Sequence, residues 1–547
     1  MATVIVNNKS VAIGDKERLN VIQAAARAGI EVPSYCWHAA LTVVASCRMC
    51  LVVVGEKKDD GTIAMQAKVV PGCQTPVKDK MVIVTDSKKA KDAQAQTLEG
   101  LLLNHPLDCP VCDKAGECKL QDFSYEYGHA TSRMIDDKNT PPNKPGISSK
   151  ITLFTDRCIM CSRCVRFTRE ISGTAELMVI NRGDHSEIDI FPGEPLENKL
   201  AGNVVDLCPV GALGSKDFLY KQRVWYLQEQ ESVCPRCSTG CSVQIDANKE
   251  VVYRLRPREN PQAQGWFMCD EGRYDYHYVN SKQRLMRPLA RTASGLTPKA
   301  WRDLLPLVRR DLADAATRNP EQVVGVLSPY LTIEEAFLLA KFLKGLSPKV
   351  RLALAPLPVV GQDDTFPKDR RGRSIDPVKF TIRAEKCPNR RGVEQILKHF
   401  QGMVITFADV VKDVDKGNVQ ALFVTAAYPP DLPAFDPNPI SVLAKAPTLI
   451  VQDLFPTALS NAAKYVIPAT TFAEKDGVFV NYDDLAQAIH RAVHPPQEAR
   501  TEGQVYLDLL GRTGLVQAAA IRKELAREVP FFAPLAVESS SLGIRLR

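Results

Sequence analysis

The stretch Cys158-Ile-Met-Cys161-Ser-Arg-Cys164-Val-Arg166 carries the strongest chemical signal in the chain and decides its fold class. Its Cys-x-x-Cys-x-x-Cys spacing places three thiolates on one short loop, and Cys208-Pro209 follows about forty residues later. Such a loop can bind three corners of a [4Fe–4S] cluster while the distant Cys-Pro binds the fourth. A zinc ribbon uses two Cys-x-x-Cys pairs. The triplet therefore favours iron over zinc or over plain buried cysteines.

Length and composition describe an ordinary multi-domain globular protein. The 547 residues predict three to five domains, and 45% are apolar and 24% charged. The net charge of +7 is small over this length. It permits an acidic partner surface but does not argue for nucleic-acid binding.

The sixteen cysteines are concentrated in one half of the chain. Fifteen lie before residue 270, in tight groups, and no secretory segment opens the sequence. This pattern predicts a reduced, cytoplasmic setting in which metal holds the thiolates, rather than disulfides. No apolar run approaches the roughly 18–20 residues of a membrane span, so no transmembrane segment is expected.

Residues 1–85 are expected to fold as two strands, a helix, a cysteine loop and further strands. Val4 and Val6 alternate with polar neighbours, and an apolar helical stripe stops at Gly29. The candidate ligands of this region are Cys36, Cys47, Cys50 and Cys73. The order resembles plant-type ferredoxins and their [2Fe–2S] cluster, although ten residues, not four, separate the first two cysteines. His38 is expected to be an exposed loop residue and not a ligand.

Residues 86–131 are expected to begin with a helix that ends before Pro106. The candidate ligands that follow are His105, Cys109, Cys112 and Cys118. One imidazole and three thiolates at this spacing suit zinc or a [4Fe–4S] cluster equally. Their position directly upstream of the Cys158 triplet makes iron the better choice.

Two further modules follow a polar, Pro-rich connection at residues 132–150. The central cluster module is expected at 151–222, and a small four-cysteine domain at 223–275. The ligands of the four-cysteine domain are Cys234, Cys237, Cys241 and Cys269. A [4Fe–4S] cluster is expected there, with zinc as the strongest competitor. Fifteen cysteines and His105 then make sixteen ligands, which is four sites of four.

From residue 276 the chain alternates between strand-like and helical stretches. Strand-like runs at 323–327, 351–354, 421–425, 448–452 and 478–480 predict a doubly wound parallel sheet over residues 276–500. A capping box at Thr332 and Glu335 opens a helix expected to end at Gly345. The charged loop 362–391 is expected on the surface, and residues 501–547 as a helical tail.

Laid out in this order, the chain resembles the family of the iron–sulfur G subunit of bacterial NADH-quinone oxidoreductase, respiratory complex I. The resemblance covers about the first 275 residues by the order of the four sites, and the rest less specifically. It implies one [2Fe–2S] cluster at Cys36 and three [4Fe–4S] clusters at the later sites. The His105 site directly before a ferredoxin module is the most specific part.

The C-terminal half resembles the molybdopterin oxidoreductase domain. Glu474-Lys-Asp-Gly477 and Asn481 are similar to that family's late motif. Some 270 residues are too few for the full catalytic domain, and no ligand for molybdenum is recognisable. Cys387, in a charged loop, is interpreted as an incidental thiol. We therefore expect an α+β multi-domain protein: ferredoxin-like iron–sulfur modules, then a shortened α/β doubly wound domain without molybdopterin.

The resemblance implies electron transfer without bond-making chemistry. Electrons would come from a subunit that binds NADH and FMN and pass to a quinone-side iron–sulfur subunit, in a membrane-bound complex. The first three clusters would form the relay, and the Cys234 cluster would be structural. Arg163 and Arg166 would favour reduced clusters if they point inward. The absence of an Arg- and Ser-rich presequence favours a bacterial chain on the cytoplasmic side of the inner membrane.

Three other functions remain as alternatives. A subunit of an NAD-linked hydrogenase would lack most of the C-terminal half, and one of a formate dehydrogenase would be much longer and hold molybdenum or tungsten. An active molybdoenzyme conflicts with the length and the missing ligand. A zinc-rich binding protein would carry basic patches near its cysteines, whereas the charge here is evenly spread.

Overall fold

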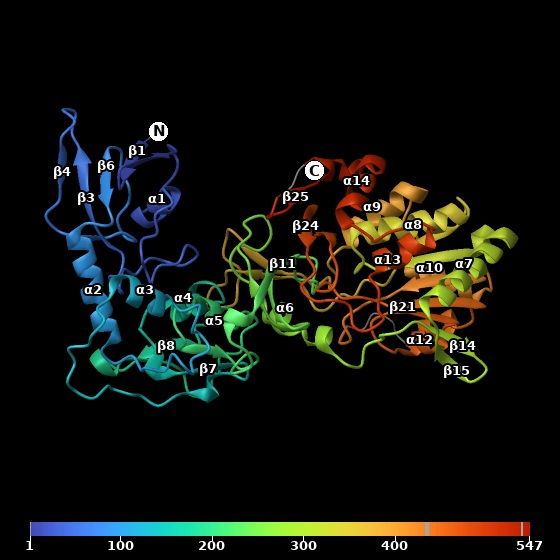
Figure 1. Ribbon diagram of the computed structural model, residues 1–547, viewed down its shortest axis with the longest axis horizontal. Coiled ribbons are helices and arrows are strands. Elements are labelled where there is room, and N and C mark those ends of the chain that lie inside the picture. Colours follow the sequence, from blue (N-terminus) through green and yellow to red (C-terminus); the bar gives the residue numbers. More distant parts are fainter. Residues whose placement is uncertain (1, 433–436, 538–539) are drawn as a thin grey trace. The chain divides into compact units, whose positions relative to one another are not determined.

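The computed structural model describes residues 2–432, 437–537 and 540–547, and it divides into two compact units (Figure 1). Unit 1 consists of Met1–Tyr226 together with Phe366–Pro377. Unit 2 consists of Leu227–Thr365 and Val378–Arg547. Each unit is described by itself below.

Unit 1 opens with a small sheet domain. Its elements are β1 (Ala2–Val6), β2 (Lys9–Ile13), α1 (Val21–Arg27), β3 (Leu51–Lys57), β4 (Ile63–Met65), β5 (Val70–Pro71) and β6 (Met81–Val84). The strand order is β2-β1-β6-β3-β4, with β5 paired to β3. Asn20 and Gln23 form a capping box on α1, and Gly29, at φ +69°, follows the helix as predicted. The helix and the sheet enclose one apolar core.

The rest of unit 1 carries two helices and a ferredoxin-like module. Its elements are α2 (Lys88–Leu102), α3 (Lys119–Tyr127), β7 (Ile151–Leu153), α4 (Arg163–Glu170), β8 (Leu177–Ile180), β9 (Glu187–Ile190), α5 (Asn203–Leu207) and β10 (Leu213–Ser215). Antiparallel pairs join β7 to β10 and β8 to β9. Phe366–Pro377 packs on this module, where the N–H of Lys368 donates to the carbonyl of Ile171 at 3.0 Å. Gly173 leaves room for that contact, because a Cβ there would lie 2.5 Å from the carbonyl oxygen of Asp369.

Unit 2 begins with a three-stranded antiparallel sheet and one short helix. These elements are β11 (Gln228–Val233), β12 (Ser242–Asn248), β13 (Val251–Pro257) and α6 (Asp270–Tyr274). The strands of the large domain follow: β14 (Leu289–Thr292), β15 (Gly295–Pro298), β16 (Val323–Leu327), β17 (Arg351–Leu354), β20 (Ala421–Thr425), β21 (Thr448–Asp453) and β22 (Tyr465–Pro468). They form one seven-stranded sheet in the order β15-β14-β22-β21-β20-β16-β17, and neighbours from β22 to β17 are parallel.

Helices cover both faces of the large sheet. They are α7 (Trp301–Arg318), α8 (Ile333–Leu346), α9 (Arg390–Gln401), α10 (Phe407–Asp415), α11 (Pro437–Leu443), α12 (Ala458–Ala462), α13 (Glu502–Leu509) and α14 (Ala518–Glu528). One core joins the sheet to α7, α8, α9, α13 and α14, and another joins it to α10, α11 and α12. Two cores on opposite faces make the sheet doubly wound, as the alternating sequence pattern predicted.

Some elements differ from the sequence expectation. Val478–Val480 was expected in the parallel sheet, but β23 (Gly477–Val480) pairs instead with β24 (Leu485–Ile489), which pairs with β25 (Ile544–Arg545). Helix α8 continues through Gly345 to Leu346 and is capped at Ser347. Residues 502–535 of the expected tail pack into the core of the large domain. The short strands β18 (Asp364–Phe366) and β19 (Phe380–Ile382) lie in the expected surface loop.

Within the described parts of the chain, no helix combines the length and apolar composition that a membrane crossing requires.

Candidate metal centres

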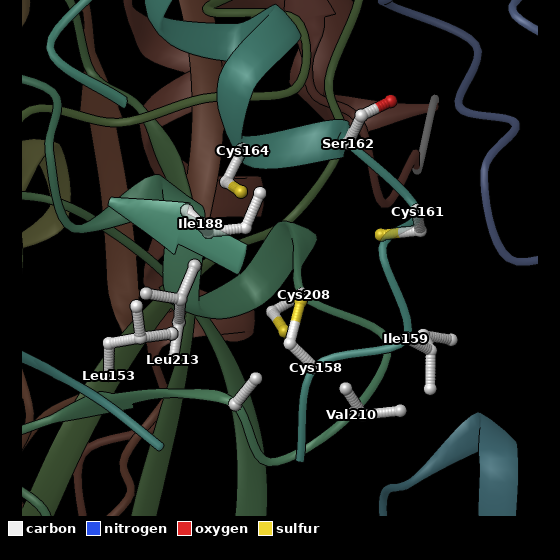
Figure 2. Close-up of a pocket in the computed structure, with 11 residues that line it drawn as sticks. Leu153, Cys158, Ile159, Cys161, Ser162, Cys164, Ile188, Cys208, Val210 and Leu213 are labelled. Carbon is white, nitrogen blue, oxygen red and sulfur yellow. The ribbon is translucent and has the colours of Figure 1, made fainter. Parts of the chain in front are cut away.

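The Cys158 loop surrounds a cavity with thiols and apolar side chains. Cys158 and Cys161 come from the loop that leads into α4, Cys164 lies in the first turn of α4, and Cys208 follows α5 (Figure 2). Met160 and Ser162 have left-handed backbones at φ +52° and +57°, which wind the loop tightly enough to present successive thiols to one cavity. The apolar part of the lining is Leu153, Ile159, Ile188, Val210, Ala212 and Leu213.

Electrostatics at the Cys158 cavity favour a cationic occupant. Burial raises the pKa of the Cys158 thiol to about 12 and that of Cys161 to about 11. Thiolates therefore form here only when positive charge compensates them, which iron supplies. The four thiols and the apolar lining fit a [4Fe–4S] cluster.

Hydrogen bonds bring the Cys36, Cys47, Cys50 and Cys73 thiols together at a second site. The N–H of Cys36 donates to Sγ of Cys47, and the N–H of Cys73 to Sγ of Cys50, both at 3.5 Å. A hydrogen bond from the Cys47 thiol lowers the pKa of Cys36, whereas one to Cys36 raises the pKa of Cys73. Thiols in mutual contact and donors aimed at sulfur are what a small iron–sulfur cluster requires.

The third site lies between α2 and α3. His105 has a buried Nδ1 without a partner in the described residues, and its pKa is lowered to about 4, mainly by burial. The imidazole is therefore neutral at physiological pH and can bind a metal. Cys112 and Cys118 are buried, whereas Cys109 is exposed. A neutral ring nitrogen and three thiols are the ligand types that a cluster with one histidine ligand requires.

The Cys112 side of this site packs against the ferredoxin-like module. A Cβ at Gly211 would lie 2.1 Å from Sγ of Cys112, so only glycine fits there. Arg223 donates from Nη1 to the carbonyl of Cys112 at 2.7 Å. Arg157 donates from Nη2 to Oδ2 of Asp108 at 2.8 Å. The third site is thus fixed to the module that carries the Cys158 site.

The fourth site lies in unit 2, and its four thiols are all buried. They belong to Cys234, Cys237, Cys241 and Cys269. Sγ of Cys269 accepts from the N–H of Gly272 at 3.3 Å, and a Cβ at Gly272 would lie 2.8 Å from Sγ of Cys234. Burial raises the pKa of the Cys234 thiol to about 12. The glycine leaves room for sulfur at a site whose thiols again need compensating positive charge.

The structure thus places the four predicted ligand sets in four separate places. Among the described residues, no three His, Cys, Asp or Glu side chains gather as they would around one metal ion. In an iron–sulfur cluster the ligands bind different iron atoms, so they surround the whole cluster and do not gather around a single ion.

Two sequence expectations about single residues are wrong. Cys387 was expected in a surface loop, but it is 0% exposed and belongs to the core under α10 and α12, and its neighbours Lys386 and Asn389 are buried as well. His38 was expected to be exposed, but it is half-buried, and burial together with Arg163 and Arg166 lowers its pKa to about 4.

The late motif has structural roles in this chain. Glu474 pairs with Arg284, and both are buried. Nζ of Lys475 lies 2.9 Å from Glu335 and 3.4 Å from Glu502. Asn481 donates from Nδ2 to the carbonyl of Thr239 at 3.0 Å, in the Cys237–Cys241 loop. Sequence alone could not assign the partners that lie 140, 190 and 242 positions away.

Family models match every region that carries a candidate site. The matches are a 2Fe-2S iron-sulfur cluster binding domain (residues 3–88), the NADH-ubiquinone oxidoreductase-G iron-sulfur binding region (94–133), the ferredoxin-like domain of NADH-quinone oxidoreductase subunit 3 (148–214), the molybdopterin oxidoreductase Fe4S4 domain (227–281) and molybdopterin oxidoreductase (403–512). They define a class of protein in which iron–sulfur modules precede a molybdopterin oxidoreductase-type domain.

Curated relatives narrow this class. The chain is 36% identical over 333 residues to the G subunit of NADH-quinone oxidoreductase from Rickettsia conorii, covering 60% of this chain and 47% of the relative. It is 34% identical over 376 residues to the NADH-ubiquinone oxidoreductase 75 kDa subunit of Reclinomonas americana, covering 68% and 51%. The chain is therefore similar to the G subunit of NADH-quinone oxidoreductase over the part of its sequence that these matches cover. It spans about half the length of these relatives.

A solved structure is also similar in part. It is an NAD+-reducing [NiFe]-hydrogenase in the H2-reduced state, 26% identical, with a TM-score of 0.35. The match covers 41% of this chain and 91% of that chain.

Proposed function

We propose that the chain is an iron–sulfur electron-transfer subunit of NADH:quinone oxidoreductase. It would hold one [2Fe–2S] cluster at the Cys36 site and [4Fe–4S] clusters at the His105, Cys158 and Cys234 sites. When bound, each cluster takes up and releases one electron at a time. The chain supplies the ligands, holds the sites at fixed separations and excludes water from them.

The observation that carries the proposal is the contact between three sites within unit 1. Arg166 donates to the carbonyls of Cys36 and Cys161, which joins the first site to the Cys158 site. Gly211 lies against Sγ of Cys112, which joins the Cys158 site to the His105 site. These contacts link the Cys158 site to both of the others, and the ring of Tyr35, beside Cys36, also packs on Phe123 of α3, with centroids 5.5 Å apart. Three contacting redox sites in one unit are what an electron relay needs.

The exposed end of this relay is at Cys109. Cys109 is the one candidate ligand thiol that is exposed among the described residues, and Leu107 and Val111 beside it are also exposed. An exposed ligand within an apolar surface suits electron exchange with another protein. We propose that the quinone-side iron–sulfur subunit binds here, and that the NADH- and FMN-binding subunit donates at the other end.

The Cys234 site has a different proposed role. It lies in unit 2, and its loop is hydrogen-bonded to distant parts of the large domain. The N–H of Ser238 donates to the carbonyl of Glu385 at 3.0 Å, and Nε2 of Gln487 donates to the carbonyl of Gly240 at 2.7 Å. We propose that a cluster at this site stabilises the domain instead of passing electrons along the main route.

The large domain is proposed to be a scaffold without molybdopterin. In doubly wound sheets, ligands bind at the carboxyl ends of the strands, at the point where the strand order reverses. In this sheet that point lies between β16 and β20. The rings of Tyr330 and Tyr428 follow these strands, with centroids 5.1 Å apart. Their hydroxyls donate to the carbonyls of Lys386 and Pro356 at 2.7 and 2.6 Å. Two buried phenols, each of which donates a hydrogen bond to a backbone carbonyl, thus lie at this position.

The proposed location is the cytoplasmic side of a bacterial inner membrane, through the other subunits of the complex.

The test is the content of iron, acid-labile sulfide, molybdenum, tungsten and zinc in the anaerobically purified chain. Four clusters as assigned predict about 14 iron atoms per chain. About ten irons with one zinc would leave the relay intact and make one site structural zinc. Stoichiometric molybdenum or tungsten would replace the scaffold role with an enzyme, as in the formate dehydrogenase alternative.

A further inference from the structure

Two arginines of α4 lie between two of the candidate cluster sites. Arg166 is 6% exposed. Its Nη1 donates to the carbonyl of Thr42 at 2.5 Å, and its Nη2 donates to the carbonyls of Cys36 and, at 3.3 Å, Cys161. One planar guanidinium therefore joins the loop of the Cys36 site to the loop of the Cys158 site.

Arg163 repeats this arrangement one turn earlier. Its Nη2 donates to the carbonyl of Trp37 at 2.5 Å, next to Cys36. Its Nη1 donates to the carbonyl of Leu207 at 3.3 Å, next to Cys208. Two arginines thus span the same pair of loops, and each contacts the backbone beside ligands of both sites.

The charges of these arginines lack a conventional partner. In the described part of the chain, their guanidinium groups bond to carbonyl oxygens only, and Nε of each is buried without an acceptor. Burying a cation without an anion is costly, so buried arginines are normally paired with carboxylates. A cluster held by four thiolates is an anion, and its negative charge grows when an electron is added.

We propose that Arg166, supported by Arg163, is the positioning residue of electron transfer between the Cys36 and Cys158 clusters. Its fork fixes the separation of the two loops, and its charge favours the reduced state of both clusters. This inference rests on the proposed function, since it requires clusters at both sites.

The test compares R166Q with R169Q in the full-length chain, purified anaerobically with its clusters. Arg169 is exposed on the same helix, so R169Q removes the same charge where solvent screens it. In EPR-monitored redox titrations, R166Q should lower the ratio of reduced to oxidised cluster at least tenfold at both sites, a shift of about 59 mV. R169Q should change these ratios by less than about twofold.

A conservative variant separates charge from position. R166K keeps the charge but loses the planar fork. It should retain ratios close to those of the unaltered chain, while the spin relaxation of the reduced Cys36 cluster by its neighbour weakens because the loops are no longer held together. A purely structural arginine would not divide the two readouts in this way.

Several results would overturn the inference. One is an R166Q titration that matches R169Q, and another is an R166K shift as large as that of R166Q. If R166Q assembles no cluster, the R163Q variant is titrated instead, because it leaves the guanidinium of Arg166 in place. Unchanged ratios of reduced to oxidised cluster in R163Q then contradict the inference. If the unaltered chain holds no cluster at Cys36 or Cys158, the proposed function fails as well. If both clusters are intact and their reduction potentials do not change in R166Q, the role of Arg166 is contradicted and the proposed function is not.

Discussion

Among the described glycines, Gly211 leaves the least room for a side chain beside a candidate ligand. A Cβ at this position would lie 2.1 Å from Sγ of Cys112, well inside any real contact. G211A should therefore displace Cys112 and release the cluster of the His105 site. We expect a loss of about four iron atoms per chain, with the other sites retained. Iron and sulfide analysis together with EPR measures both effects.

Gly214 provides the matched control for this change. It lies in β10, three residues away, and a Cβ there would come no closer than 3.4 Å to Cγ2 of Thr152, an ordinary contact. G214A should keep its full iron content. An intact His105-site signal in G211A would show that Cys112 is not a ligand in the position described.

Asp453 makes the stability of the large domain depend on pH. Burial raises the pKa of this carboxyl from 3.8 to about 6, although Leu454 and Thr457 hydrogen-bond to it. The folded state therefore binds a proton more tightly than the unfolded state, so stability falls as pH rises from about 4 to about 6. D453N removes this effect and should stabilise the domain more at pH 8 than at pH 5, by about 1 kcal/mol.

Scanning calorimetry of the chain at pH 5 and pH 8 checks this difference. D314N, an exposed residue of α7, serves as the control and should shift both unfolding midpoints equally. Equal gains of D453N at the two pH values would contradict a buried carboxyl that is protonated near pH 6.

At the scale of elements, Lys475 ties the ends of two helices to one loop. Nζ of Lys475 pairs with Glu335 in the first turn of α8 and with Glu502 in the first turn of α13. All three side chains are buried. K475M would leave two buried carboxylates without a cation, which costs about 3–5 kcal/mol of unfolding free energy.

Thermal unfolding of K475M and of K412M distinguishes this role from a general loss of charge. Lys412 lies on α10 with an exposed side chain, and its pairing with Asp409 is at the surface. K412M should unfold within about 0.5 kcal/mol of the parent chain. If K475M were equally stable, Lys475 would not be the ion that balances these carboxylates.

The elements that sequence predicted best are the buried parallel strands. Three of these strands have the bounds that the apolar runs indicated: Val323–Leu327, Arg351–Leu354 and Ala421–Thr425. A strand buried on both faces is apolar along its length, so the apolar run marks where it begins and ends. Val478–Val480 has the same composition but pairs elsewhere, since an apolar run does not encode its partner strand. Partner choice depends on the packing of the whole domain.

The candidate ligands could be proposed from sequence, because most of them follow a local spacing within one loop. The contacts of Arg166 were not, since they join residues 124 and 130 positions apart. The burial of Cys387 was missed for a related reason. Its charged neighbours indicated a surface loop, but Lys386 pairs with Glu271 and Arg390 with Glu385, so these charges are satisfied without exposing the thiol.

At the scale of the whole molecule, the four sites are divided between the two units. The Cys36, His105 and Cys158 sites lie in unit 1, and contacts through Arg166 and Gly211 connect them. The Cys234 site lies in unit 2. Arg236, inside that loop, is buried and pairs with Glu271 at 2.8 Å and with Asp275 at 3.2 Å. The loop therefore depends on charges of its own unit, as a structural site would.

This division predicts opposite phenotypes for two cysteine variants. C237A removes a ligand from the Cys234 site and should lower the amount of assembled complex more than the turnover per assembled complex. C161A removes a ligand from the Cys158 site of the proposed relay and should abolish NADH:quinone turnover in whatever complex assembles. The measurements are the yield of complex from membranes and the turnover normalised to that yield. Normal assembly with lost turnover in C237A would move the Cys234 cluster onto the electron route, and the hydrogen bonds from Ser238 and Gln487 would then serve to align it.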